Sequence, residues 1–267
     1  MQNDWKNVFT FAKNLVLDGG EQIRSSFKDE LTIKFKTNAS DLVTNMDKQI
    51  EQFFINKIHE KYPSHRILGE EGQGDDVSSM NGTVWIIDPI DGTMNFVHMQ
   101  RHFAISVGVY HNGVGIIGFI YDVAADDLFY AIKGEGAYLN DEKLPMLQSI
   151  DIGQAVFGIN AAWGFEKERI DAKIIPALIK NVRGTRSFGS ATIEMAYVAA
   201  GKLDGYLSLR LSPWDFAAGK IIVEEVGGKV SSVKGGPLDM LARQTPVFVA
   251  KPGLHEYILN NFFAKSK

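Results

Sequence analysis

The sequence predicts an α+β protein in which helices and β-strands form separate layers. Apolar residues recur at helical spacing from Val8 to Phe27, and they alternate at strand spacing between Phe103 and Tyr138. After Pro145 predicted strands alternate with predicted helices. Because 45% of the 267 residues are hydrophobic, the chain can bury a sizeable core, and this excludes disordered and fibrous proteins.

The first half begins with helices and ends in a β-meander. In chain order we expect a helix that is long or interrupted once at Gly19-Gly20, a hairpin or loop at Leu31–Ser40, a helix from Thr44 that ends before Pro63, and short strands at Arg66–Leu68 and Thr83–Ile87. The meander strands are Phe103–Tyr110, Val114–Tyr121 and Leu128–Ile132. Asn112-Gly113 between the first two is a strong hairpin turn.

The second half carries four predicted strands and four predicted helices. The strands are Val156–Ile159, Leu203–Leu207, Lys229–Ser232 and Val247–Ala250, and the helices are Glu166–Lys180, Ala191–Ala200, Phe216–Val226 and Leu254–Phe263. No repeat or low-complexity linker marks a boundary between the halves. We therefore expect one domain over 1–267, built from two α/β halves at approximately 1–145 and 146–267.

Charge and composition exclude several classes of partner. The 28 basic and 32 acidic residues give a net charge of −4, which provides no field to hold nucleic acid or an anionic membrane. The chain has no cysteine, so disulfides and thiolate metal sites are excluded. It shows no signal peptide and no apolar run near the roughly 18 residues that a membrane span needs. We expect a soluble, cytoplasmic protein.

Two short patterns suggest cofactor sites that the context does not favour. Gly113, Gly115 and Gly118 match the spacing of a dinucleotide-binding loop, but the residues that follow them are β-like and not helical. His98 and His102 have the spacing of a zinc-binding pair, but they lack the glutamate of the protease motif. A hairpin and two packing or surface histidines are the favoured interpretations.

Acidic residues follow several of the predicted strands. Glu70 and Glu71 come after one apolar run, Asp88 and Asp91 after the next, and Asp215 follows Trp214. Helix capping is the simplest explanation for Asp215 behind Ser212, and equally for Asp47 behind Thr44.

Capping does not account for Asp88 and Asp91, because a buried strand delivers both carboxylates into one turn. No lysine or arginine lies between Arg66 and Arg101, so a counter-cation is implied. Oxygen ligands favour Mg²⁺ or Mn²⁺, and four carboxylates can hold two such ions about 4 Å apart for phosphate ester hydrolysis. If a helix begins at Thr93, the amides of Gly92 and Thr93 form a phosphate site beside the metal ions.

Four motifs together resemble one known family. They are Asp41-Leu-Val-Thr44-Asn-Met-Asp47, Gly69-Glu70-Glu71-Gly72, Asp88-Pro-Ile-Asp91-Gly-Thr93-Met-Asn95-Phe96 and Trp214-Asp215-Phe-Ala-Ala-Gly219. In order and spacing they resemble the inositol monophosphatase family of Mg²⁺-dependent, lithium-sensitive phosphatases over nearly the whole chain. The resemblance implies a layered α-β-α-β-α sandwich of the inositol monophosphatase and fructose-1,6-bisphosphatase type. It also implies a homodimer that hydrolyses phosphomonoesters with two or three Mg²⁺ ions.

The resemblance also implies a role for each matched residue. Glu70, Asp88 and the carbonyl of Ile90 would hold the first ion, and Asp88, Asp91 and Asp215 the second, while Glu70 would help to bind a weaker third ion through waters. Thr93, paired with Asp47, would orient the attacking water. The amides of Gly92 and Thr93 would bind the phosphate, and the segment Lys34–Ser40 corresponds to a loop that closes over the site.

Three departures from the family pattern affect substrate choice. Met94 stands where the family usually has a second threonine, and Ser208 stands where inositol-selective members carry a glutamate. The turn that contains Gly189, Ser190 and Ala191 is only loosely similar to the substrate-binding turn of the family, as is the segment Asn160–Gly164. Arg186 and Arg210 are either surface residues or contacts for an additional anionic group.

The sequence therefore predicts a phosphomonoesterase but leaves its substrate open. Inositol 1-phosphate is the first candidate, and the alternatives are the 2′-phosphate of NADP, fructose 1,6-bisphosphate and 3′-phosphoadenosine 5′-phosphate. A non-catalytic sugar-phosphate-binding regulator is the remaining hypothesis. We expect such a regulator to have lost Asp47 or Thr93, and both are present.

Overall fold

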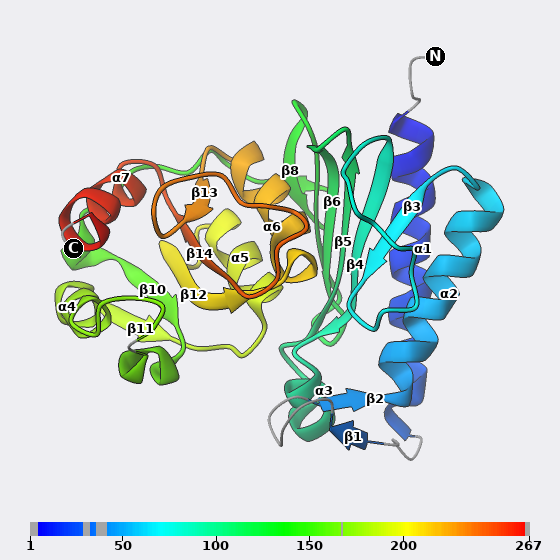
Figure 1. Ribbon diagram of the computed structural model, residues 1–267, viewed down its shortest axis with the longest axis horizontal. Helices are drawn as coiled ribbons and strands as arrows, with labels where there is room; N and C mark the ends of the chain where they lie inside the picture. Colours follow the sequence, from blue (N-terminus) through cyan, green and yellow to red (C-terminus); the bar gives the residue numbers. More distant parts are fainter. Residues whose placement is uncertain (1–4, 29–32, 36–41, 167, 265–267) are drawn as a thin grey trace.

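The computed structural model describes residues 5–28, 33–35, 42–166 and 168–264. They form five layers in which helices alternate with two β-sheets (Figure 1). Helices α1 and α2 cover the outer face of the larger sheet, α5 and α6 lie between the sheets, and α4 and α7 cover the outer face of the smaller sheet. The predicted layered α+β sandwich is confirmed.

The outer layer on the N-terminal side consists of two long helices. Helix α1 (Trp5–Ser25) runs through Gly19-Gly20 without a break and ends in a short 3₁₀ turn, η1 (Ser26–Lys28). The two glycines are buried, and a Cβ added to Gly20 would overlap the Tyr121 ring, so they permit close packing and do not interrupt the helix. The strands β1 (Ile33–Phe35) and β2 (Leu42–Thr44) pair antiparallel, and α2 (Asn45–Lys61) follows directly.

The larger sheet has seven strands that are neighbours in chain order. They are β3 (Arg66–Gly69), β4 (Thr83–Asp91), β5 (Ala104–His111), β6 (Val114–Asp122), β7 (Asp127–Ile132), β8 (Gly136–Leu139) and β9 (Glu142–Lys143). Strands β3 and β4 are parallel, and every later pair is antiparallel. The predicted meander is confirmed, and Gly113 to Gly118 belong to the β5–β6 hairpin and form no dinucleotide loop.

The smaller sheet has five strands in the order β11-β10-β12-β14-β13. Their bounds are β10 (Val156–Ile159), β11 (Gly184–Arg186), β12 (Gly205–Leu211), β13 (Lys229–Ser232) and β14 (Thr245–Ala250). Strand β11 was not expected from the sequence. It pairs parallel with β10 at the edge of the sheet, and its three residues are too few to produce an alternating pattern.

The remaining helices agree with the sequence prediction except in one segment. They are α3 (Thr93–Met99), α4 (Ile174–Asn181), α5 (Ala191–Ala199), α6 (Pro213–Glu225) and α7 (Leu254–Ile258), with short helical turns η2 (Ile152–Gln154), η3 (Ala161–Phe165) and η4 (Leu259–Phe263). The predicted helix Glu166–Lys180 is wrong in its first half. The Glu166 carboxylate instead accepts hydrogen bonds from the amides of Glu168 and Arg169 and so stabilises a turn. Pro176 then lies in the first turn of α4, where proline is tolerated.

Helix α6 lies directly on the larger sheet, and its contacts with the sheet fix the position of its first turn, which contains Asp215. The Ser106 hydroxyl of β5 donates to the carbonyl of Trp214 at 3.2 Å, and the Tyr110 hydroxyl donates to that of Ala217 at 2.9 Å. Gly118 of β6 permits the close approach, because an added Cβ would lie 2.7 Å from the Ala218 carbonyl oxygen. None of the helices in the described residues is long and apolar enough to span a membrane.

Candidate active site

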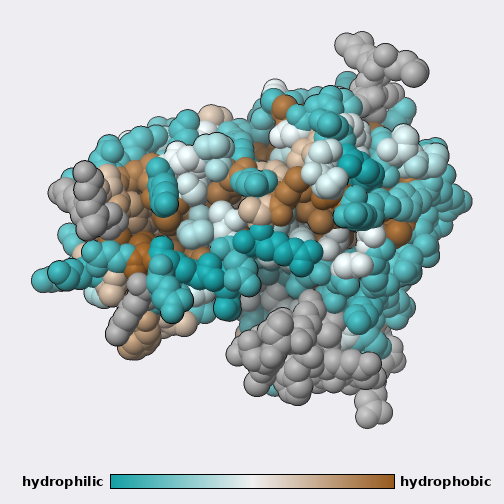
Figure 2. Space-filling view, viewed as in Figure 1, coloured by the Kyte–Doolittle hydropathy of each residue, from teal (hydrophilic) through white to brown (hydrophobic). Residues whose placement is uncertain are grey.

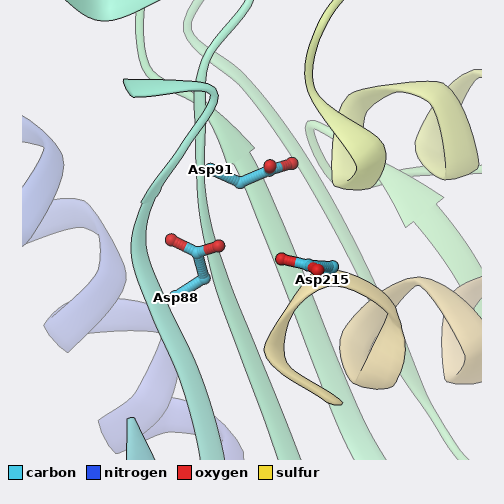
Figure 3. A group of neighbouring side chains, drawn as sticks. All are labelled: Asp88, Asp91 and Asp215. Atoms are coloured by element: carbon cyan, nitrogen blue, oxygen red, sulfur yellow. The ribbon is translucent and has the colours of Figure 1, made fainter. Parts of the chain in front are cut away.

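Three carboxylates gather where β4 ends against the first turn of α6. Asp88 and Asp91 come from β4 and Asp215 from α6, and their side chains point into one shared space (Figure 3). One ligand oxygen from each residue lies within 4.8 Å of the others. The register of β4 against β5 shifts between Asp88 and Asp91, and this irregularity lets both carboxylates face the same side although they are three residues apart.

Hydrogen bonds from the second half of the chain hold Asp91. Its Oδ2 accepts from the hydroxyls of Ser190 and Thr192, each at 2.6 Å, and from the amide of Thr192 at 2.7 Å. Asp88 is 1% exposed, and its Oδ1 accepts from the amide of Ile90 at 3.0 Å. A sequence pattern cannot indicate the bonds to Asp91, because donor and acceptor are about a hundred residues apart in the chain.

Asp215 has both roles that the sequence suggested for it. Its Oδ2 accepts from the amide of Ser212 at 2.7 Å, which caps the helix, and Pro213 is the first residue of the helix. The same side chain belongs to the carboxylate cluster. Capping therefore explains why an aspartate stands at this position. The same hydrogen bond holds the Asp215 carboxylate near the end of β4.

The electrostatics of the cluster favour a bound cation. Burial raises the pKa of Asp88 well above its usual range, and repulsion from Glu70, Asp91 and Asp215 raises it further. Burial also raises the pKa of Asp91, although its hydrogen bonds lower it in part. Among the described residues no lysine or arginine forms an ion pair with Asp88 or Asp91. A set of close carboxylate oxygens with this repulsion fits a hard divalent ion such as Mg²⁺.

Glu70 lies next to the cluster, on the loop that leaves β3. Its charge raises the pKa of Asp47, Asp88 and Asp91, so it is close to all three. Glu51 of α2, which is 0% exposed, holds this loop through the amides of Glu71 and Gln73, both at 2.8 Å.

Sequence reasoning missed Glu51. The available signal was its spacing from Asp47, since residues four apart lie on the same face of a helix.

Thr93 and Asp47 form the pair that the family resemblance implied. The Thr93 Oγ1 lies 3.0 Å from Oδ1 of Asp47 and 3.1 Å from the carbonyl oxygen of Ile90. A hydroxyl has one proton, so Thr93 donates to one of these acceptors at a time. The other carboxylate oxygen of Asp47 accepts from the amide and hydroxyl of Thr44, which confirms the predicted capping box.

The glycine turn before Thr93 contacts the turn that precedes α5. Helix α3 begins at Thr93 as expected, and Gly92 has a φ of +90°, a conformation that favours glycine. A Cβ added to Gly92 would lie 3.2 Å from the Ser190 Cβ and 3.3 Å from the Gly189 carbonyl oxygen. Asn95 joins the same two segments by donating to the carbonyls of His102 and Phe188, at 2.7 and 2.6 Å.

Ala191 and Ser208, the remaining residues predicted to bind substrate, are both buried. Ala191 begins α5 directly after Gly189 and Ser190. Ser208 is only 4% exposed and hydrogen-bonds the buried side chain of Tyr206, so it lies behind the surface of the site.

Arg186 and Arg210 both lie on the surface of the protein. Arg186 is exposed, and Arg210 stacks over Trp163 with its guanidinium carbon 5.9 Å from the ring centroid. Most of the predicted loop Lys34–Ser40 lies outside the described residues.

Comparisons with known proteins identify the family of the chain. The model of the inositol monophosphatase family matches residues 4–264. The inositol-1-monophosphatase of Bacillus subtilis (strain 168) is 49% identical over 264 residues, which are 99% of both chains. A crystal structure of SaIMPase-II with inositol monophosphate bound is 39% identical, with a TM-score of 0.86 over 97% of this chain and 94% of that one. An IMPase/NADP phosphatase complexed with Mg²⁺ and phosphate is 27% identical, with a TM-score of 0.87 over 96% of this chain and 94% of that one.

Proposed function

Because the chain belongs to the inositol monophosphatase family and is a phosphoric monoester hydrolase, we propose that it hydrolyses inositol 1-phosphate with Mg²⁺ as cofactor. One observation carries the proposal: a cluster of three carboxylates lies beside the hydrogen-bonded pair Asp47 and Thr93. The cluster supplies cation ligands, and the pair can accept a proton from water. Phosphate ester hydrolysis needs both.

We assign the cation ligands from the family resemblance, and the clustering of Asp88, Asp91 and Asp215 supports the assignment. Glu70, Asp88 and the Ile90 carbonyl would hold one Mg²⁺, and Asp88, Asp91 and Asp215 a second, while Glu70 would help to bind a third and weaker ion. When bound, Mg²⁺ neutralises charge on the phosphate and makes a nearby water more acidic. The Ile90 carbonyl would then be occupied, which would leave Asp47 as the acceptor for the single proton of Thr93.

The reaction then depends on a short hydrogen-bonded path. The Thr93 hydroxyl donates to Asp47 and accepts a hydrogen bond from the attacking water, so the water oxygen is oriented toward phosphorus and its proton passes toward Asp47. The amides of Gly92 and Thr93 bind phosphate oxygens. As the water oxygen bonds to phosphorus, the ester bond breaks and the inositol oxygen leaves, taking up one proton in place of the proton that the attacking water has given up. Gly189, Ser190 and Ala191 contact the inositol ring, with Ser208 behind them.

Phosphate release measured over a panel of substrates tests this function. The panel contains inositol 1-phosphate, NADP, fructose 1,6-bisphosphate and 3′-phosphoadenosine 5′-phosphate, each with Mg²⁺ and with a chelator. We expect turnover of inositol 1-phosphate that the chelator abolishes and lithium inhibits. No release from any substrate with Mg²⁺ would favour the non-catalytic regulator.

NADP 2′-phosphatase activity is the second candidate, and the short side chain of Ser208 favours it. A charged acceptor for a substrate hydroxyl contributes about 1.5–3 kcal/mol, and serine cannot replace the glutamate of the inositol-selective members. We therefore expect kcat/KM for NADP to equal or exceed that for inositol 1-phosphate. A preference for the inositol ester above about a hundredfold would contradict this second activity.

Two further properties stay predictions from the sequence. We infer a homodimer from the family resemblance, and light scattering of the purified protein tests it. The cytoplasmic location is an expectation from composition, which fractionation of the source cells tests.

A further inference from the structure

Glu194 of α5 is a buried carboxylate that the proposed mechanism does not use. It is 3% exposed. Its Oε1 accepts from the amides of Phe188 at 2.7 Å and Gly189 at 3.4 Å. Its Oε2 is buried and has no hydrogen-bond partner among the described residues. A buried ionisable group with half of its acceptors unmatched destabilises a fold, so its presence requires another explanation.

The surroundings of Glu194 connect it to the site. Burial raises its pKa to about 7, the two amide hydrogen bonds oppose this rise, and the charge of Asp91 adds to it. Tyr206 of β12 faces the same carboxylate, whose charge raises the pKa of the tyrosine. Gly158 of β10, the register partner of Tyr206, leaves room for the carboxylate, because a Cβ added there would lie 2.7 Å from Oε2.

The turn that Glu194 holds lies directly against the glycine turn of the site. Asn95 of α3 fixes the Phe188 carbonyl, while Glu194 of α5 fixes the amides of Phe188 and Gly189. The turn is therefore held from both sides, and Gly189 within it has a φ of +80°. Ser190, which caps α5, and Thr192 in its first turn hold Asp91.

We propose that Glu194 is a positioning residue: through two backbone amides it fixes the Phe188–Gly189 turn against Gly92, and so sets the affinity for the organic part of the substrate. The proposal rests on the proposed function, since it assigns the turn to substrate binding. Glu194 touches neither substrate nor the reacting atoms. Its loss should weaken binding more than it slows the chemical step.

Glu194→Ala and Glu194→Gln test this role with inositol 1-phosphate at saturating Mg²⁺. The alanine variant loses both hydrogen bonds, and we expect KM to rise about tenfold or more with a smaller change in kcat. Glutamine keeps one oxygen that can accept from both amides, so it should restore most of the affinity. Glu225→Ala is the matched control, because Glu225 also accepts from two backbone amides, those of Gly134 and Gly136, at a turn of the larger sheet.

A structural role alone predicts a different result. Loss of folded protein lowers the apparent kcat and leaves KM unchanged, and the Glu225 variant would then behave in the same way. A folded Glu194→Ala enzyme with an unchanged KM would overturn the proposal. Thermal unfolding of each variant establishes that it is folded.

A second variant tests the role if Glu194→Ala does not fold. Gly158→Ala displaces the carboxylate and leaves Glu194 in place, so we expect KM to rise in the same direction. Gly153→Ala is its control, since an added Cβ there meets nothing within 4 Å. An unchanged KM in Gly158→Ala would also contradict the proposal. Failure of the wild-type enzyme to release phosphate would contradict the proposed function instead.

Discussion

Individual aspartates in this protein have two tasks at once. Asp47 uses Oδ2 to cap α2 and Oδ1 to accept from Thr93, and Asp215 caps α6 while it joins the carboxylate cluster. The capping boxes could be predicted from the sequence because both partners lie within four residues. The bond to Thr93 spans 46 residues, and only the family resemblance indicated it.

Asp88 is the side chain we assign to both principal metal ions. Replacing Asp88 with asparagine removes a charge and a bridging ligand, so we expect kcat to fall by about 10³-fold or more. Glu71→Gln is the matched control on the neighbouring loop, and it should retain most of the activity. Steady-state phosphate release at saturating Mg²⁺ compares the two. Near-full turnover by the Asp88→Asn enzyme would contradict the shared-ligand assignment.

Thr93 is assigned to orient water and not to bind metal. Thr93→Ala should lower kcat by about 10²-fold or more while the affinity for Mg²⁺ stays nearly unchanged. Thr93→Ser keeps the hydroxyl and should retain much of the rate. Calorimetric titration with Mg²⁺ beside steady-state kinetics separates the two effects. Weak Mg²⁺ binding by the alanine variant would count against the assigned role.

At the scale of helices and strands, local signals predicted most elements but missed the short strands β8, β9 and β11 and misplaced the start of α4. Thr44 and Ser212 precede helices that begin where their capping pattern predicts, and Asn112-Gly113 forms the expected hairpin. The helix predicted from Glu166 begins only at Ile174, and Pro176 then lies in its first turn, where proline is tolerated. Strand β11 was missed because its conformation depends on pairing with β10, which no local pattern encodes.

The contact between β6 and α6 gives a prediction for Gly118. Alanine usually stabilises a strand interior relative to glycine by about 0.5–1 kcal/mol. Here its Cβ would lie 2.7 Å from a backbone oxygen of α6, and overpacking of this kind costs about 1–3 kcal/mol. We expect Gly118→Ala to lower the melting temperature and, because α6 carries Asp215, to reduce kcat as well. Gly153→Ala is the control, and equal melting temperatures for the two variants would show that α6 adjusts freely.

At the scale of the whole molecule, the two sheets share one layer of helices. Helix α6 contacts strands of both sheets, and a single apolar cluster includes residues from both (Figure 1). The front face is mostly hydrophilic, with apolar residues in scattered patches (Figure 2). The single domain that the sequence predicted should therefore unfold in one cooperative transition. Calorimetry checks this expectation. Two separated unfolding transitions would show that the two halves unfold independently.

Stability should depend on pH and Mg²⁺ together. Burial raises the pKa values of Asp47, Asp88 and Asp91 above those of the unfolded chain. Without metal, the folded state thus binds protons that the unfolded state has released, and stability falls as the pH rises from about 4 through the raised pKa values. Mg²⁺ replaces these protons, so it should raise the melting temperature more at pH 7.5 than at pH 5. If Mg²⁺ raised the melting temperature equally at both pH values, the result would contradict repulsion among the buried carboxylates.

Much of the site could be predicted from the sequence, but its supporting contacts could not. Asp88, Asp91 and Thr93 lie in one motif, and Asp215 lies in another. The groups that hold the site in place, among them Glu51 and Glu194, act on backbone amides of other segments. Backbone amides carry no sequence signature, so only the fold identifies their partners.

The long separation between Asp91 and its partners also constrains how the chain reaches its native state. Strands β4 to β9 pair with neighbours in the chain and can associate early, whereas the bonds from Asp91 to Ser190 and Thr192 close a loop of about a hundred residues. The carboxylates of β4 and α6 repel one another as the halves dock. We therefore expect counter-ions to accelerate the docking step, and a chain that folds during synthesis completes this carboxylate cluster only after α6 has been made.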